Sequence, residues 1–215
     1  MSDRSLSIAQ EALRRHPRSR ADALGIDMTK NTPSPLFQWL IASLLFSARI
    51  SADQAEAAAR ALFDQGWRTA DAMAASTWEQ RTKVLNAAGY ARYDESTSRY
   101  IGDATERLLD LYDGDLRAMR QEVDGDLEAM RASLKKFKGI GDVGADIFLR
   151  EAQLSWDHLH PFADQRALTA AAKLGLPRTA RDLAALVPPR DFPRLLDALV
   201  RIDLADEVED VKRAA

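Results

Sequence analysis

The sequence predicts an all-α protein, and three patterns carry this prediction. Apolar residues recur at spacings of three and four along most segments, which is the periodicity of one helix face. Sustained alternation of apolar and polar residues, the pattern of a half-buried strand, occurs nowhere in the chain. Helix-start signals also recur, because Ser51 precedes Gln54 and Ser76 precedes Glu79 at the spacing of a capping box. Together the patterns indicate roughly ten helices.

The predicted helices follow one another with short connections. The most apolar one starts at Ser34 and Pro35, which suit the N-cap and the first helical position, and it ends near Phe46. Residues 25–34 and 156–163 are expected to be connecting loops, and the charged tail over 206–215 is expected to be frayed. We expect helices over residues 5–16, 35–48, 51–65, 76–88, 98–112, 115–123, 126–138, from 143 onward, and over 166–174, 179–186 and 191–204.

Length and composition exclude several classes of protein. The 215 residues, 46% hydrophobic and 29% charged, suit a globular chain of one domain or two small lobes. The sequence contains no cysteine, which excludes disulfides, thiolate zinc sites and cysteine-ligated iron–sulfur clusters. Its three histidines are too scattered to predict a metal site, so we expect neither a metal nor a cofactor. The net charge of -3 limits any nucleic-acid contact to a local basic patch.

The N-terminal residues Met1-Ser2-Asp3-Arg4 do not begin an apolar run, so no signal peptide is expected. No stretch approaches the roughly 20 apolar residues that a membrane-spanning helix needs. The sequence therefore predicts a cytoplasmic protein with no membrane partner, associated with the nucleoid if the cell is prokaryotic.

Residues 126–149 combine a glycine hairpin with a basic stripe. A helix capped by Asp126 is expected to end at Lys138, and Gly139 and Gly141 permit the positive φ angles of a tight turn. Ile140 can serve as an apolar plug beneath the turn, and a second helix then starts near Val143. The free N–H groups at that helix start form an anion-binding site, and phosphate is the expected ligand. Basic residues stand just before it, at Arg131, Lys135, Lys136 and Lys138, which predicts contact with a nucleic-acid backbone without sequence preference.

Two other interpretations of the hairpin exist. Residues 139–144 also spell G-x-G-x-x-G, but a dinucleotide-binding fingerprint follows a β-strand, and here the preceding residues are helical and rich in lysine. The plainer alternative is a glycine turn between two packed helices with solvated lysines. The hairpin alone leaves that alternative open.

The segment from Phe137 to Ala145 resembles the helix-hairpin-helix element of the DNA glycosylase superfamily (HhH-GPD) that includes endonuclease III. In that family an aspartate opens a helix some twenty residues after the hairpin, and this chain has Asp164 in Phe162-Ala163-Asp164-Gln165-Arg166. The resemblance also covers residues 35–51 and 88–93. It implies two helical lobes, one over 35–154 that ends in the hairpin and one made of 1–34 plus 155–215.

The resemblance implies a DNA base-excision repair glycosylase that flips a damaged or mispaired base from double-stranded DNA. Breaking the N-glycosidic bond gives the sugar oxocarbenium character, which a carboxylate stabilises, and Asp164 is the expected carboxylate. Taken alone, Asp164 is better explained as a helix N-cap; its spacing from the hairpin favours the catalytic role, and both roles can hold together. Bifunctional members carry a nucleophilic lysine where this chain has Val143, so AP-lyase activity is expected to be weak or absent. The four-cysteine iron–sulfur cluster of many relatives is impossible here.

Two departures from the family pattern concern DNA contact. Arg49 stands where the family has a gap-filling glutamine, and it is also explained as an ordinary surface arginine; Asp142 stands where a basic residue is frequent. They leave open a catalytically inactive helix-hairpin-helix DNA-binding protein, or a helical interaction protein that binds no nucleic acid. We expect a monomer, since the fold needs no partner subunit. The expected DNA-contacting residues are Arg49, Lys136, Lys138, Gly139, Ile140, Gly141, Val143, Gly144 and Ala145.

Overall fold

The computed structural model describes residues 3–215, which form fourteen α-helices and three 3₁₀ turns and contain no strand. The all-α prediction is confirmed. The chain divides into two compact units: unit 1 joins the residues up to Ala23 to Arg150–Ala215, and unit 2 is Leu24–Leu149. The lobes expected from the sequence divide after residues 34 and 154, whereas the observed units divide after Ala23 and Leu149. None of the described helices is long and apolar enough to cross a membrane.

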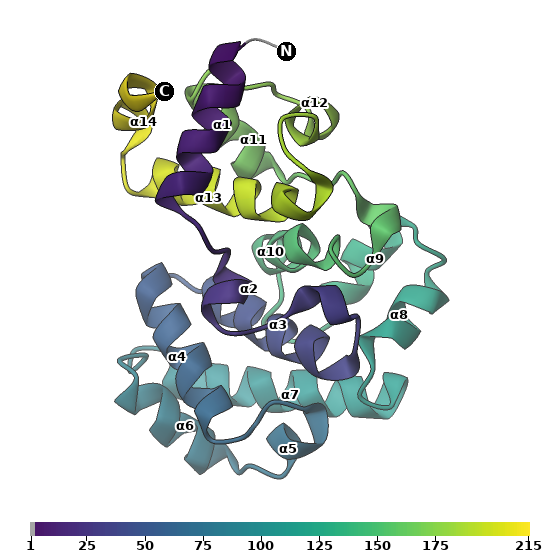
Figure 1. Ribbon diagram of the computed structural model, residues 1–215. Helices are drawn as coiled ribbons and strands as arrows, with labels where there is room; N and C mark the ends of the chain where they lie inside the picture. The colour runs from purple at the N-terminus through teal and green to yellow at the C-terminus, as the bar shows by residue number, and fades with distance from the viewer. Residues whose placement is uncertain (1–2) are drawn as a thin grey trace. The chain divides into compact units, whose positions relative to one another are not determined.

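Unit 2 is built around α3, which is buried at every residue from Leu36 to Leu45. Helices α4, α7 and α8 pack against α3, and α6 lies along α7 (Figure 1). The apolar sequence of α3 follows from this position, because a helix contacted on several sides has no polar face. Unit 2 contains η1 Met28–Lys30, α3 Pro33–Phe46, α4 Ala52–Asp64, α5 Ala70–Ala74, α6 Trp78–Ala87, α7 Asp94–Tyr112, α8 Leu116–Glu122, α9 Leu127–Leu134 and most of α10 Asp142–Ala152.

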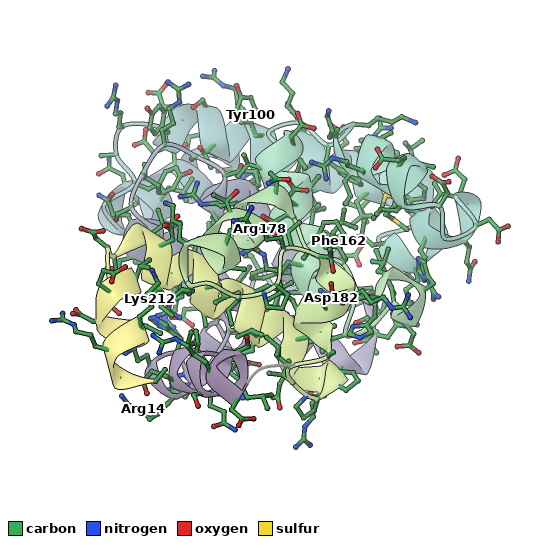
Figure 2. The ribbon with its side chains drawn as sticks, turned by 90° about the horizontal axis from the view of Figure 1, so that it is seen from above. Arg14, Tyr100, Phe162, Arg178, Asp182 and Lys212 are labelled. Atoms are coloured by element: carbon green, nitrogen blue, oxygen red, sulfur yellow. The ribbon has the colours of Figure 1, made fainter. Side chains whose placement is uncertain are left out.

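Unit 1 is organised around α13, whose apolar face packs against α1 and α11 (Figure 1). The tail predicted to be frayed instead forms α14, which packs on α1 and buries Val211 completely. Figure 2 labels Arg14 on α1 and Lys212 on α14. Unit 1 contains α1 Asp3–Arg15, α2 Arg20–Ala23, the end of α10, η2 Asp157–Leu159, α11 Gln165–Lys173, α12 Ala180–Ala184, η3 Pro189–Asp191, α13 Phe192–Leu204 and α14 Val208–Ala214.

The predicted helix starts are confirmed in one case and displaced in two. The capping box of Ser51 with Gln54 is formed at the start of α4. At α6 the capping box belongs to Thr77 and Gln80, one residue later than predicted. Helix α3 begins at Pro33 rather than Pro35, because the extended Thr32 (φ -119°, ψ 159°) serves as its N-cap and Pro33 fits the first helical position.

Two boundaries near the hairpin also differ from the prediction. Helix α9 ends at Leu134 rather than at Lys138, because tight turns with Lys136 N–H donating to the Ser133 carbonyl and Phe137 N–H to the Leu134 carbonyl follow it. Helix α10 already begins at Asp142. The hairpin is therefore a seven-residue connection, residues 135–141, rather than a two-glycine turn between long helices.

Candidate functional site

The hairpin requires glycine at position 139. Gly139 has φ +88°, which L side chains rarely adopt, and a Cβ there would lie 3.0 Å from Leu44 Cδ1 and 3.1 Å from Tyr100 Cβ. Tyr100, labelled in Figure 2, lies on α7. Gly139 thus lets the backbone pass close to two packed helices, α3 and α7.

The residues after Gly139 seat the start of α10 on unit 2. Ile140 is 4% exposed, in agreement with the predicted apolar plug. A Cβ on Gly144 would meet Ile140 at 3.4 Å and Ser47 Cβ at 3.5 Å, so Gly144 allows close packing against the end of α3. Gly141 is exposed and has free space around it, while Ala145 is fully buried. The exposed backbone at Gly141 and the first turn of α10 is therefore open to an approaching ligand.

The four basic residues predicted beside the hairpin divide into two pairs. Lys135 Nζ lies 2.7 Å from an oxygen of Asp142, and Arg131 forms an ion pair with Asp146. Lys135 accordingly lowers the pKa of Asp142, and the Asp146 carboxylate raises that of Arg131. Lys136 and Lys138 are exposed, and no carboxylate in the described part of the chain pairs with either. This second pair carries the available positive charge of the hairpin.

Contacts connect the hairpin to the loop that carries Arg49. Ser47, before Arg49, places its Oγ 3.5 Å from the Gly139 carbonyl oxygen. Gln54, after Arg49, donates from Nε2 to the Gly89 carbonyl in the α6–α7 loop at 3.3 Å. The exposed Arg49 therefore belongs to one contiguous surface with the hairpin and the α6–α7 loop. Val143 adds an apolar side chain that is 55% exposed.

Asp164 lies in unit 1, at the N-cap of α11. Its Oδ1 accepts hydrogen bonds from the backbone N–H groups of Arg166 and Ala167 at 3.1 and 3.2 Å. Its Oδ2 accepts from Arg150, whose Nε and Nη2 lie at 2.9 and 2.7 Å. The side chains of Arg150 and Asp164 are only 8% and 2% exposed, so this is a buried ion pair. The N-cap interpretation of Asp164 is confirmed, and Arg150 adds a partner that was not predicted.

The connector before Asp164 is held by the amide of Gln153. Gln153 Nε2 donates to the Phe162 carbonyl at 3.0 Å, and Gln153 Oε1 accepts from the Phe162 backbone N–H at 3.2 Å. Phe162 is labelled in Figure 2. His160 Nδ1 lies 3.3 Å from Gln153 Oε1, and the His160 ring packs edge-on against Phe192. These contacts fix the chain that leads into α11, and with it the backbone of Asp164.

Behind the ion pair lies a second buried carboxylate, Asp197, on α13. Asp197 Oδ1 is 4.0 Å from Arg150 Nη1 and 3.5 Å from Arg20 Nε, and Oδ2 has no hydrogen-bond partner among the described residues. The neighbouring Glu151 is also buried, and burial, together with the charge of Asp197, raises the pKa of Glu151 to about 8. At neutral pH Glu151 is therefore mostly protonated, whereas Asp197 has three arginines within 4.0 Å.

Sequence patterns did not predict Arg150, Glu151 or Asp197 as parts of a site. The sequence nevertheless contains one indication of these residues. Arg150 and Glu151 continue the apolar run that ends at Leu149, and Asp197 stands between Leu196 and Ala198 in an apolar helix. A charged residue at a core position of a helix is costly unless it is paired, so such positions indicate buried ion pairs.

Comparisons with known proteins show which solved structures are similar to this one. No protein-family model matches the sequence, and no curated protein matches it either. Two structures of endonuclease III with DNA are similar. The trapped covalent intermediate, an estranged-adenine complex, is 20% identical, with a TM-score of 0.50 over 78% of this chain and 73% of that one. The non-covalent complex is 19% identical, with a TM-score of 0.53 over 90% and 81% of the two chains.

A third similar structure is the H. pylori 3-methyladenine DNA glycosylase (MagIII) bound to 1,N6-ethenoadenine. It is 14% identical, with a TM-score of 0.56 over 88% of this chain and 99% of that one. The fold is thus that of the helix-hairpin-helix DNA glycosylases. Endonuclease III and a 3-methyladenine DNA glycosylase both share this fold with the chain, and the expected fold is confirmed.

Proposed function

We propose that this protein is a DNA base-excision repair glycosylase that hydrolyses the N-glycosidic bond of a damaged or mispaired base flipped from duplex DNA. One observation carries the proposal: a fold shared with DNA glycosylases combines a glycine hairpin, flanked by unpaired lysines, with a buried aspartate at the N-cap of the next α-helix, α11. We also propose that the protein acts as a monomer in which residues 35–154 form one domain and residues 1–34 with 155–215 form the other.

The hairpin supplies the DNA contact. The N–H groups in the first turn of α10, at Asp142, Val143 and Gly144, have no partner within the helix and favour an anion. Lys136 and Lys138 add positive charge without a competing carboxylate partner in the described residues, and the open space around Gly141 leaves room for a DNA backbone. Contacts of this kind hold the phosphates of the duplex without reading its sequence.

Asp164 supplies the chemistry. Departure of a base leaves positive charge on the sugar, which a fixed carboxylate stabilises, and water then attacks the sugar carbon. Val143 has no amine with which to form a Schiff base. The enzyme is therefore monofunctional, leaving an abasic site with little or no cleavage of the strand.

A second candidate is a non-catalytic DNA-binding protein that keeps the hairpin alone. The observation that favours it is the ion pair of Asp164 with Arg150, which partly neutralises the candidate carboxylate and buries it. This candidate shares the DNA contact with the first and differs only in the chemistry.

A lesion panel separates the two candidates. Duplexes with uracil, an oxidised pyrimidine, an oxidised purine, 3-methyladenine, 1,N6-ethenoadenine, mispaired adenine or an abasic site are incubated with the wild type and Asp164→Asn. They are then analysed with and without hot alkali. A monofunctional glycosylase gives breaks that need alkali and disappear in Asp164→Asn. Absence of enzyme-dependent breaks on every duplex, together with retained duplex binding, establishes the non-catalytic candidate.

The DNA contact needs its own control. In the double variant Lys136→Glu with Lys138→Glu, charge reversal removes both unpaired cations, so duplex affinity falls at least tenfold. Lys173→Glu, on α11 of unit 1, reverses one charge outside the hairpin segment and should have little effect. Equal affinity in the double variant and the wild type would show that Lys136 and Lys138 do not contact DNA, and no measurable affinity in either would favour the helical interaction protein that binds no nucleic acid.

A further inference from the structure

The carboxylate of Asp164 is held by three hydrogen bonds and an ion pair. A carboxylate offers about four lone-pair directions. Here the Arg166 and Ala167 N–H groups approach Oδ1, and Arg150 Nε and Nη2 both approach Oδ2. A carboxylate that already accepts three hydrogen bonds and pairs with an arginine has little acceptor capacity left for a proton from water. Its charge and orientation, by contrast, are fixed.

Arg150 is itself held in place from two sides. Its backbone carbonyl accepts a hydrogen bond from Gln153 Nε2 at 2.8 Å, and its Nη1 lies 4.0 Å from Asp197 Oδ1. The planar guanidinium thus lies between Asp164 and Asp197, a geometry that a lysine ammonium does not reproduce. The charged and titratable groups around the pair are Glu151 on α10, Arg20 and Asp22 on α2, His16 after α1, Arg201 on α13 and His160 in the connector.

We propose that Arg150 is a positioning residue for Asp164, which makes Asp164 a fixed negative charge beside the substrate sugar rather than a general base. The inference rests on the proposed glycosylase function for its catalytic part. Its structural part, that Arg150 holds the buried carboxylate in its orientation, rests on the contacts alone. A buried carboxylate that loses its opposite charge takes up a proton at higher pH.

The test compares the wild type with Arg150→Met and Arg150→Lys. The Asp164 carboxyl carbon is followed by ¹³C NMR as the pH is varied. We expect its titration midpoint to rise by about one pH unit or more in R150M and by less in R150K, which keeps a positive charge. In base release, R150M should lower kcat at least tenfold with KM unchanged. The acidic limb of its pH–rate profile should move to higher pH, and R150K should restore part of the rate.

Lys173→Met is the matched control, because it removes another cation of unit 1 from its ion pair with Asp203. It should change neither the midpoint nor kcat. Circular dichroism shows whether each variant is folded. If R150M does not fold, the comparison of the wild type with R150K provides the test. Identical Asp164 midpoints in folded wild type and R150 variants would overturn the positioning role. A wild type that releases no base refutes the proposed function instead, and the NMR comparison still decides the role of Arg150.

Discussion

At the scale of single residues, Val143 is the residue on which the proposed absence of strand cleavage depends. Val143 lies in the first turn of α10 with its side chain 55% exposed, and it matches the position of the lysine nucleophile in bifunctional glycosylases that this chain resembles. We predict that Val143→Lys brings an amine to this position and allows Schiff-base formation with an abasic site. Borohydride should then trap the variant covalently on abasic duplex, and the wild type should show little or no trapping.

Val143→Arg is the control for this substitution. It adds the same charge but no amine that can form a Schiff base, so it should bind duplex at least as tightly as V143K without being trapped. Equal trapping of V143R and V143K, or none in V143K despite tight binding, would show that position 143 does not face the sugar.

Predictions for single residues were correct where the conformational or packing properties of the residue type itself specify its role. Gly139 was predicted from the conformational freedom of glycine, and Ile140 from its place between two glycines; the structure gives a positive φ and a buried plug. Arg150 could not be assigned as the partner of Asp164 in the same way. The pair forms only when the connector held by Gln153 brings α11 back to the end of α10, and no local pattern specifies that return.

At the scale of elements, helices α9 and α10 are tied by ion pairs across the hairpin. Asp142 binds Lys135 at 2.7 Å and lies 3.7 Å from Arg131, although its side chain is 65% exposed. This carboxylate neutralises part of the basic stripe at the helix start where a phosphate would bind. The pair adds little to stability, because exposed ion pairs are weak.

We predict that Asp142→Asn strengthens duplex binding several-fold at low salt. The substitution removes a negative charge from the phosphate site and frees Lys135 for DNA. The slope of log affinity against log salt concentration should become steeper by about one. Fluorescence anisotropy with a labelled duplex at several salt concentrations measures both quantities.

Glu128→Gln gives the matched control for Asp142→Asn. It removes one exposed negative charge from the first turn of α9, where no ion pair with Lys135 exists. Its affinity should stay close to that of the wild type. If E128Q and D142N strengthen binding equally, the effect comes from net charge and not from the hairpin.

Elements were predicted well where they are long and poorly where they are short. The stripe of α3 and the capping box of α4 are strong signals over many residues. Helix α5 has only five residues, Ala70–Ala74, too few to show a periodicity, and it was not predicted. Helix α14 looked like a charged tail because only Val211 is buried among its residues, and its position depends on packing against α1.

At the scale of the whole molecule, the chain has two cores, because its C-terminal third packs against its first helix in unit 1, separately from the core of unit 2. The core of unit 1 joins Ile8 and Ala12 of α1 to Leu195 and Leu199 of α13, nearly the full sequence apart. Local periodicity shows which face of each helix is apolar but does not show which faces meet. The two-unit arrangement was therefore expected from resemblance to a family, and composition allowed one domain equally well.

The core of unit 1 also contains a carboxyl group that makes stability depend on pH. Glu151 is 2% exposed, and burial, with the nearby charges of Asp197 and Asp22, raises its pKa from 4.5 to about 8. Between these pH values the folded state holds a proton that the unfolded state has released. The stability from protonated Glu151 is therefore fully present below pH 4.5 and is lost as pH rises to about 8.

We predict that Glu151→Gln removes this loss, because glutamine keeps the size and polarity of a protonated glutamate without ionising. The free energy of unfolding of E151Q relative to the wild type should rise with pH by up to about 1.4 kcal/mol per unit and level off near pH 8. Urea denaturation of both proteins at intervals from pH 4.5 to 9 measures the difference. Glu209→Gln, on the exposed side of α14, is the control and should give a difference independent of pH over most of that range. If the difference in unfolding free energy between E151Q and the wild type did not change with pH, Glu151 would be ionised in the folded protein. Arg150 or Arg20 would then pair with Glu151 instead of with Asp197.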